Sequence, residues 1–222
     1  MICFLLSFAS RNGYGELLMN AKSTRDHLLD VGVELMHQNG YTATGLSEIL
    51  KAADVPKGSF YHHFGSKEEF AAAALDSYIA REAKHSEAVL GNSKIPPLRR
   101  LRQYFTEMIE MYGQTGAIPG CMMGRFSLET AIENPQLRAK ISIAFQHWQH
   151  KIASVIEQAV AQGELPKGTD AEPLAGFLLN SWEGALLRSQ AEKSDAPLDI
   201  FLRYALDALT EKRKPNTQRK RH

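Results

Sequence analysis

One cysteine near the middle of the chain has the clearest potential for covalent chemistry. Cys121 follows Pro119-Gly120 and is expected to open a short helix over residues 121–132. The unpaired N–H groups and positive dipole end at a helix start favour the thiolate, and Arg125, one turn further, would favour it too. The sequence therefore predicts a thiol of lowered pKa that reacts with electrophiles or oxidants. The alternative is a small buried residue, which is how an isolated cysteine usually packs.

A second group of residues has the types and spacing that suit contact with nucleic acid. The helix-forming run 47–53 is ended by Asp54-Val55-Pro56, because the residue before a proline is pushed out of the α region. A second short helix then opens at Lys57, and no carboxylate lies between Asp54 and Glu68. Two short helices joined in this way indicate a helix-turn-helix, whose second helix can enter a major groove. An ordinary helical hairpin is the alternative.

The residues expected to meet DNA are small, cationic or hydroxyl-bearing. Gly58 lets the backbone come close, Ser59 can bond to a base or phosphate, and Lys57 can reach guanine or a phosphate. Thr44 and Lys67 are expected to hold phosphates. The full predicted set is Thr44, Ser47, Lys57, Gly58, Ser59, Tyr61, His62 and Lys67, with Phe60, Phe64 and His63 expected to be structural.

The run from Ala52 to Phe64, followed by Ser66-Lys67-Glu68-Glu69-Phe70, resembles the DNA-binding signature of the TetR/AcrR family of transcriptional regulators. The resemblance covers residues 22–82, and Asp54 and Pro56 depart from the glycine and serine common there. It implies an all-α fold, with an N-terminal three-helix helix-turn-helix domain and a C-terminal helical ligand-binding and dimerisation domain, about nine helices in all. It also implies a repressor that binds operator DNA as a homodimer and is released by a signal.

The segment 116–121, with Leu128-Glu129, is similar to the NemR-type subgroup of this family, repressors that sense electrophiles through a cysteine at this place. The similarity implies a sensing role for Cys121, with Arg125 beside it. Gln190 stands where the subgroup has a lysine, so that feature is not carried over. The alternative signal is a non-covalent hydrophobic ligand. Its expected pocket is lined by Tyr104, Met108, Tyr112, Met122, Phe126, Phe145, Trp148 and Trp182, although such stripes more often form ordinary core.

Composition allows two helical domains and gives little hint of DNA. The chain has 222 residues, 44% of them hydrophobic, which suffices for one small and one larger core. Its formal net charge is only +1, and residues 22–70 hold five Lys or Arg against seven Asp or Glu. The expected division is a disordered leader or mis-assigned start over 1–20, a DNA-binding domain over 21–82 with its helix-turn-helix at 45–64, a regulatory and dimerisation domain over 83–211, and a basic disordered tail over 212–222.

Cysteine usage agrees with a reducing cytoplasm. If the leader that carries Cys3 is absent, Cys121 is the only cysteine and no intramolecular disulfide can form. The last two predicted helices carry an apolar stripe that is expected to pair with the same helices of a second copy. Its members are Leu178, Trp182, Leu198, Phe201, Leu202, Ala205 and Leu209.

An enzyme is not supported by the motifs in this chain. It has no Ser/His/Asp set, no glycine-rich phosphate loop and no paired carboxylates of catalytic type, and no cofactor is expected. His147 and His150 have the spacing to share a metal, but no third ligand lies at usable spacing, so no metal site is predicted. A helical protein that never touches DNA remains as the last alternative.

Overall fold

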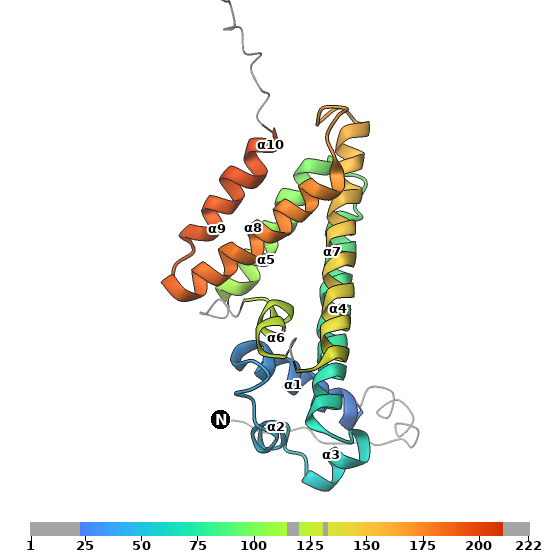
Figure 1. Cartoon of the computed structure of the whole chain (residues 1–222), viewed down its shortest axis with the longest axis vertical. Coiled ribbons are helices and arrows are strands. Elements are labelled where there is room, and N and C mark those ends of the chain that lie inside the picture. The colour runs from blue at the N-terminus through green and yellow to red at the C-terminus, as the bar shows by residue number, and fades with distance from the viewer. Residues whose placement is uncertain (1–22, 115–119, 131–132, 211–222) are drawn as a thin grey trace, which may run out of the picture.

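The computed structural model describes residues 23–114, 120–130 and 133–210, and every regular element in these ranges is a helix (Figure 1). The all-α prediction is therefore confirmed. The predicted leader and basic tail lie outside the described residues. Among the helices that are described, none combines the length and hydrophobicity needed to cross a membrane.

Three helices form the N-terminal domain: α1 (Thr24–Asn39), α2 (Leu46–Ala53) and α3 (Lys57–His63). The turn between α2 and α3 contains a residue in the left-handed conformation, Asp54, with φ 52°. Glycine adopts this conformation most easily, which agrees with the glycine that is common here in the family that the sequence resembles. Phe60 and Phe64 are buried as expected, and both pack on Phe70 with ring centroids 5.3 and 4.9 Å apart. This aromatic cluster packs α3 and the residue after it against the start of the next helix, at Phe70.

A long helix, α4 (Lys67–Leu90), leads away from this domain and lies beside α7 (Pro135–Ala161) (Figure 1). The side chain of Ser66 caps α4 by accepting a hydrogen bond from the Glu69 amide at 3.1 Å. Ion pairs join α4 to α7, including Lys140 with Asp76 at 2.5 Å. Between the two in sequence come α5 (Pro97–Gln114) and the short α6 (Met122–Thr130), which lies next to the N-terminal domain.

The last helices form one edge of the molecule. They are α8 (Ala171–Glu192) and α9 (Ala196–Phe201), and α9 continues through a π-helical turn at Leu202–Asp207 into α10 (Ala208–Thr210). Trp182 of α8 packs on Phe105 and Phe201, with ring centroids 5.1 and 5.4 Å apart. These rings join α5, α8 and α9 into one core.

The predicted dimer stripe needs correction, because most of it is already buried within the subunit. Leu178, Trp182, Leu198, Phe201 and Ala205 pack in its core, and Leu202 and Leu209 are partly buried against that core. A helical repeat of apolar residues identifies a buried face, but not whether the same chain or a second copy covers it. The large apolar side chains that these helices leave exposed are Phe177, Leu187, Ile200 and Tyr204.

Candidate DNA interface and regulatory pocket

The leading end of α3 is exposed at the far end of the molecule from α8 and α9 (Figure 1). Lys57, Gly58, Tyr61 and His62 are exposed there, and Lys57 Nζ lies 5.8 Å from the centre of the Tyr61 ring. A Cβ built on Gly58 would meet nothing within 4 Å. Ser47 of α2 is also exposed, and Ser59 is half-buried. Six of the eight predicted DNA contacts are therefore on or near one accessible surface.

The other two predicted contacts are engaged inside the protein. Thr44 is fully buried and donates its hydroxyl to the Gly40 carbonyl at 2.6 Å, so its assignment as a phosphate anchor is wrong. Lys67 is half-buried, and its ammonium donates to the Tyr41 carbonyl at 2.7 Å and lies 4.4 Å from the centre of that ring. Both side chains hold the connection between α1 and α2 in shape, a role that no local pattern in the sequence indicated.

Cys121 directly precedes α6 and is only 7% exposed. Its thiol donates a hydrogen bond to the carboxylate of Glu183, which reaches across from α8. Glu183 has room there because Gly124 lacks a side chain: a Cβ built on Gly124 would lie 2.6 Å from Glu183 Oε2 and 3.7 Å from Cys121 Cβ. The thiol and the carboxylate therefore form a close pair.

The predicted low pKa of Cys121 is wrong. Burial and then the negative charge of Glu183 raise the pKa of the thiol well above its ordinary value, and the backbone N–H groups of Gly124 and Met123 only partly offset this. Arg125 does not assist the thiol, because its guanidinium donates to the Gln38 carbonyl of α1. Burial also raises the pKa of Glu183, to about 7.

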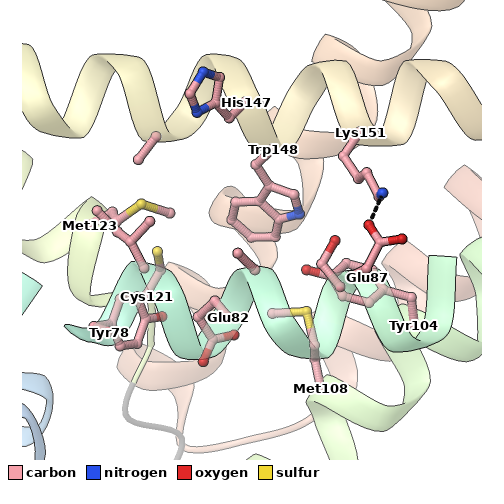
Figure 2. Close-up of a pocket in the computed structure, with 14 residues that line it drawn as sticks. Tyr78, Glu82, Glu87, Tyr104, Met108, Cys121, Met123, His147, Trp148 and Lys151 are labelled. Atoms are coloured by element: carbon pink, nitrogen blue, oxygen red, sulfur yellow. Dashed lines mark hydrogen bonds and ion pairs between the residues drawn. The ribbon is translucent and has the colours of Figure 1, made fainter. Parts of the chain in front are cut away.

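A cavity of about 250 Å³ lies between α4, α5 and α7, and Cys121 forms part of its wall (Figure 2). Three of the predicted pocket residues, Tyr104, Met108 and Trp148, line it. Phe145 stacks on Trp148 instead, and the side chain of Tyr112 lies outside the described residues. The remaining predictions, Met122, Phe126 and Trp182, are buried core residues that do not line it.

Sequence reasoning missed the polar part of this wall. Tyr78 and Glu82 of α4, and His147 and Lys151 of α7, also line the cavity. Their i, i+4 spacing on two long helices was the available signal. His150, the other histidine considered as a metal ligand, bonds instead to Glu172 at 2.8 Å. No group of three potential metal ligands occurs among the residues that the structure describes.

The segment that begins at Gly120 is joined to the N-terminal domain by hydrogen bonds. His37 Nε2 donates to the Gly120 carbonyl at 2.7 Å, and burial lowers the pKa of His37, which favours the neutral ring. Glu129 of α6 accepts from the Thr42 amide at 2.7 Å. The Arg125 bond to α1 and an edge contact between Tyr41 and Phe126, at 5.9 Å, complete this joint. No sequence signal identified His37, and Glu129 entered the sequence analysis only through the resemblance of Leu128-Glu129 to the NemR-type subgroup.

Comparison with known proteins gives two adjacent family matches. Residues 28–74 match the bacterial regulatory proteins of the tetR family, and residues 97–205 match the tetracyclin repressor-like C-terminal domain. The chain is 34% identical to the transcriptional repressor DhaR of Mycobacterium sp. (strain GP1), over 83% of this chain and 91% of that one. It is 33% identical to the repressor NemR of Escherichia coli (strain K12), over 82% and 91%.

The fold matches solved structures of the same kind. A regulatory protein TetR from Rhodobacter sphaeroides superposes with a TM-score of 0.79 at 33% identity, covering 83% of this chain and 97% of that one. The reduced form of Escherichia coli NemR superposes with a TM-score of 0.77 at 30% identity, covering 83% and 95%.

The raised pKa of Glu183 predicts a pH-dependent difference in stability between the wild type and Glu183→Gln. Protonated Glu183 stabilises the folded protein. Its contribution to stability is therefore fully present below the pKa that this carboxyl has in the unfolded chain, and it is lost as pH rises through the folded-state pKa of about 7. Each pKa unit corresponds to about 1.4 kcal/mol. In thermal melts, the melting temperature of Glu183→Gln relative to the wild type should rise between about pH 5 and pH 8. If the difference in melting temperature were the same at the two ends of this pH range, the raised pKa of Glu183 would be contradicted.

Proposed function

The chain belongs to the TetR family of bacterial regulatory proteins, and we propose that it is a cytoplasmic, homodimeric repressor that leaves its operator when Cys121 is modified. Family membership and the repressor names of two relatives support the DNA-binding part. They also weigh against an enzyme and against a helical protein with no role on DNA.

The exposed end of α3 has the properties needed to read a major groove. It is narrow at Gly58, carries a cation at Lys57 and hydroxyl groups at Ser59 and Tyr61, and holds no carboxylate. Its rear side is fixed by Phe60, which is fully buried. A short helix held rigidly by its apolar side can insert its polar side without rearranging.

Replacing Lys57 or Tyr61 by alanine should weaken DNA binding. Lys57→Ala should reduce the slope of log binding constant against log salt by about one per half-site, because each lost phosphate contact releases about one fewer counterion. Fluorescence anisotropy on a duplex selected by the protein from a random-sequence pool measures both effects. Lys94→Ala, an exposed lysine between α4 and α5, is the matched control. Wild-type affinity in both test variants would place the interface elsewhere.

The second copy is proposed to pack on the exposed apolar side chains of α8 and α9. Phe177 and Leu187 of α8 are 57% and 60% exposed. Ile200 of α9 and Tyr204 of the π-helical turn that follows it are 50% and 67% exposed. Large apolar groups gathered on two neighbouring helices indicate a surface that a partner covers. Two helices from each subunit would then meet as a four-helix interface.

Leu187→Glu should give folded monomers, because it places a charge on the proposed contact surface without disturbing the core. Phe201→Glu should instead unfold the subunit, since Phe201 packs on Phe105 at 4.9 Å and on Trp182. Ile143→Glu, at an equally exposed apolar residue of α7, is the control and should stay dimeric. Light scattering and circular dichroism distinguish these outcomes. A dimer of Leu187→Glu at micromolar concentration would contradict the interface.

The release signal is proposed to travel through the start of α6. The observation that supports this most directly is the buried hydrogen bond from His37 of α1 to the carbonyl of Gly120, the residue before Cys121. Cys121 is 7% exposed and forms part of the cavity wall, so an adduct adds bulk there that presses on the backbone at Gly120. Displacement of Gly120 breaks or moves the bond to His37 and therefore changes how α1–α3 are held. Two recognition helices must match half-sites about 34–36 Å apart, so a small shift weakens binding.

A non-covalent ligand is the second candidate signal, and the cavity supports it. Tyr104, Met108 and Trp148 form an apolar wall of the kind that binds small molecules, and Cys121 is on the same wall. Occupation of the cavity would press on the same segment. The two signals differ in their dependence on sulfur, because only a covalent one requires the thiol.

N-Ethylmaleimide or hypochlorite should release the wild-type protein from its selected duplex, with a loss of affinity of at least about tenfold, while Cys121→Ser keeps its affinity. This loss corresponds to about 1.4 kcal/mol of coupling, within the usual range for two linked sites. A reductant should restore binding after hypochlorite if the product is a sulfenic acid or disulfide, but not after N-ethylmaleimide. If both proteins release DNA equally, or neither does, the thiol signal is wrong and the non-covalent ligand takes its place.

A further inference from the structure

The carboxylate beside Cys121 is in an unusual environment. Oε1 of Glu183 is buried and has no hydrogen-bond partner within the described part of the chain, and Oε2 lies against the first turn of α6. Among the described residues, the hydrogen-bond partner of this carboxylate is the Cys121 thiol. A buried carboxyl group that lacks partners costs stability, so packing alone does not explain a glutamate here. A glutamine or an apolar residue would fill the same space at lower cost.

The environment of the Cys121 thiol lowers its reactivity. Only a thiolate is a good nucleophile, yet burial and the nearby carboxylate keep Cys121 protonated at neutral pH. A sensor built on this cysteine needs a base that removes the proton as the sulfur attacks. A carboxyl group with a pKa of about 7 is suited to this task at neutral pH, because it is partly ionised and still basic.

We propose that Glu183 is the general base that activates Cys121 toward small, uncharged α,β-unsaturated carbonyl compounds bound in the adjacent cavity, which extends the proposed thiol-based release. The hydrogen bond between the two side chains places the base at the reacting proton. The cavity volume of about 250 Å³ limits the compound to a few heavy atoms. Met108, Met123 and Trp148 favour an apolar compound, and Lys151 on the same wall is already paired with Glu87.

The reaction is an addition that needs no oxidant. The Glu183 carboxylate takes the thiol proton, and the sulfur electron pair forms a bond to the β-carbon of the alkene. The π electrons of the alkene move to the α-carbon as an enolate. The protonated Glu183, or water, then returns one proton to that carbon. The net change is the addition of S–H across C=C, with Glu183 regenerated and neither partner oxidised or reduced overall.

A purely structural glutamate predicts the opposite kinetic result. If Glu183 only repels negative charge on sulfur, removing its charge in Glu183→Gln lowers the thiol pKa and speeds alkylation. If Glu183 is the base, the same change slows alkylation, because the amide accepts the thiol hydrogen bond but cannot take the proton. The sign of the effect therefore separates the two roles.

The test is the rate of N-ethylmaleimide addition to Cys121, followed by intact mass on the full chain between about pH 5.5 and pH 8.5. Wild type should reach a plateau above about pH 7, where Glu183 is ionised. Glu183→Gln should react at least about tenfold more slowly at pH 7.5, with a rate that keeps rising with pH. Glu192→Gln, an exposed carboxylate on the same helix, should behave as wild type, and Cys121→Ser identifies the modified residue.

Other titratable groups near the thiol are unchanged in this comparison: Tyr104 on α5, Glu82 on α4, His147 on α7, and His37 on α1, which bonds to Gly120. Circular dichroism checks that Glu183→Gln is folded. An equal or faster rate in Glu183→Gln overturns the base, whether or not alkylation releases DNA. An unreactive Cys121 in the wild type overturns both proposals. Reaction without DNA release overturns only the release mechanism and leaves the base in place.

Discussion

The packing around Cys121 depends on the backbone at Gly120, which lies against His37 of α1 and Gln190 of α8. Gly120 has φ 78°, and its carbonyl accepts the hydrogen bond from His37 of the DNA-binding domain. A side chain at this residue would collide with Gln190 of α8. Glycine suits the left-handed backbone, and a larger residue would also require the end of the Gln190 side chain to move. As a result α1, the start of α6 and α8 are held within a few ångströms of the cysteine.

On the proposed mechanism, this packing explains how a thiol that is protected from solvent can still transmit a signal. A cysteine on the surface would react with many reagents and move nothing, because solvent would absorb the adduct. Cys121 is largely enclosed by protein and forms part of the cavity wall, so on the proposed mechanism a molecule reaches it through the cavity and the product presses on the neighbouring backbone. On the proposal made above, Glu183 supplies the basicity that burial removes. Selectivity then comes from the cavity, and reactivity from the carboxylate.

The two ends of the subunit have different physical requirements. The recognition helix must be rigid and polar on its outer side, and the cluster of Phe60, Phe64 and Phe70 provides that rigidity. At the other end, α8 and α9 bury one apolar face in their own core and expose a second one. The long helices α4 and α7 run between these ends and also form the cavity (Figure 1). A change at the cavity can therefore affect the spacing of recognition helices in a dimer.

Local signals in the sequence were enough to predict the helices and the helix-turn-helix. Ser23, Ser66 and Asn134 cap helices, and such a cap is a local signal because it is a bond between residues three apart. Contacts between distant segments were not predictable. Thr44 turned inward to Gly40, Phe201 was covered by its own subunit, and the pKa of Cys121 rose because of burial and then because of Glu183 on another helix. Periodicity determines which face of a helix is apolar, whereas burial and electrostatics depend on what that face meets, and only the tertiary structure decided this.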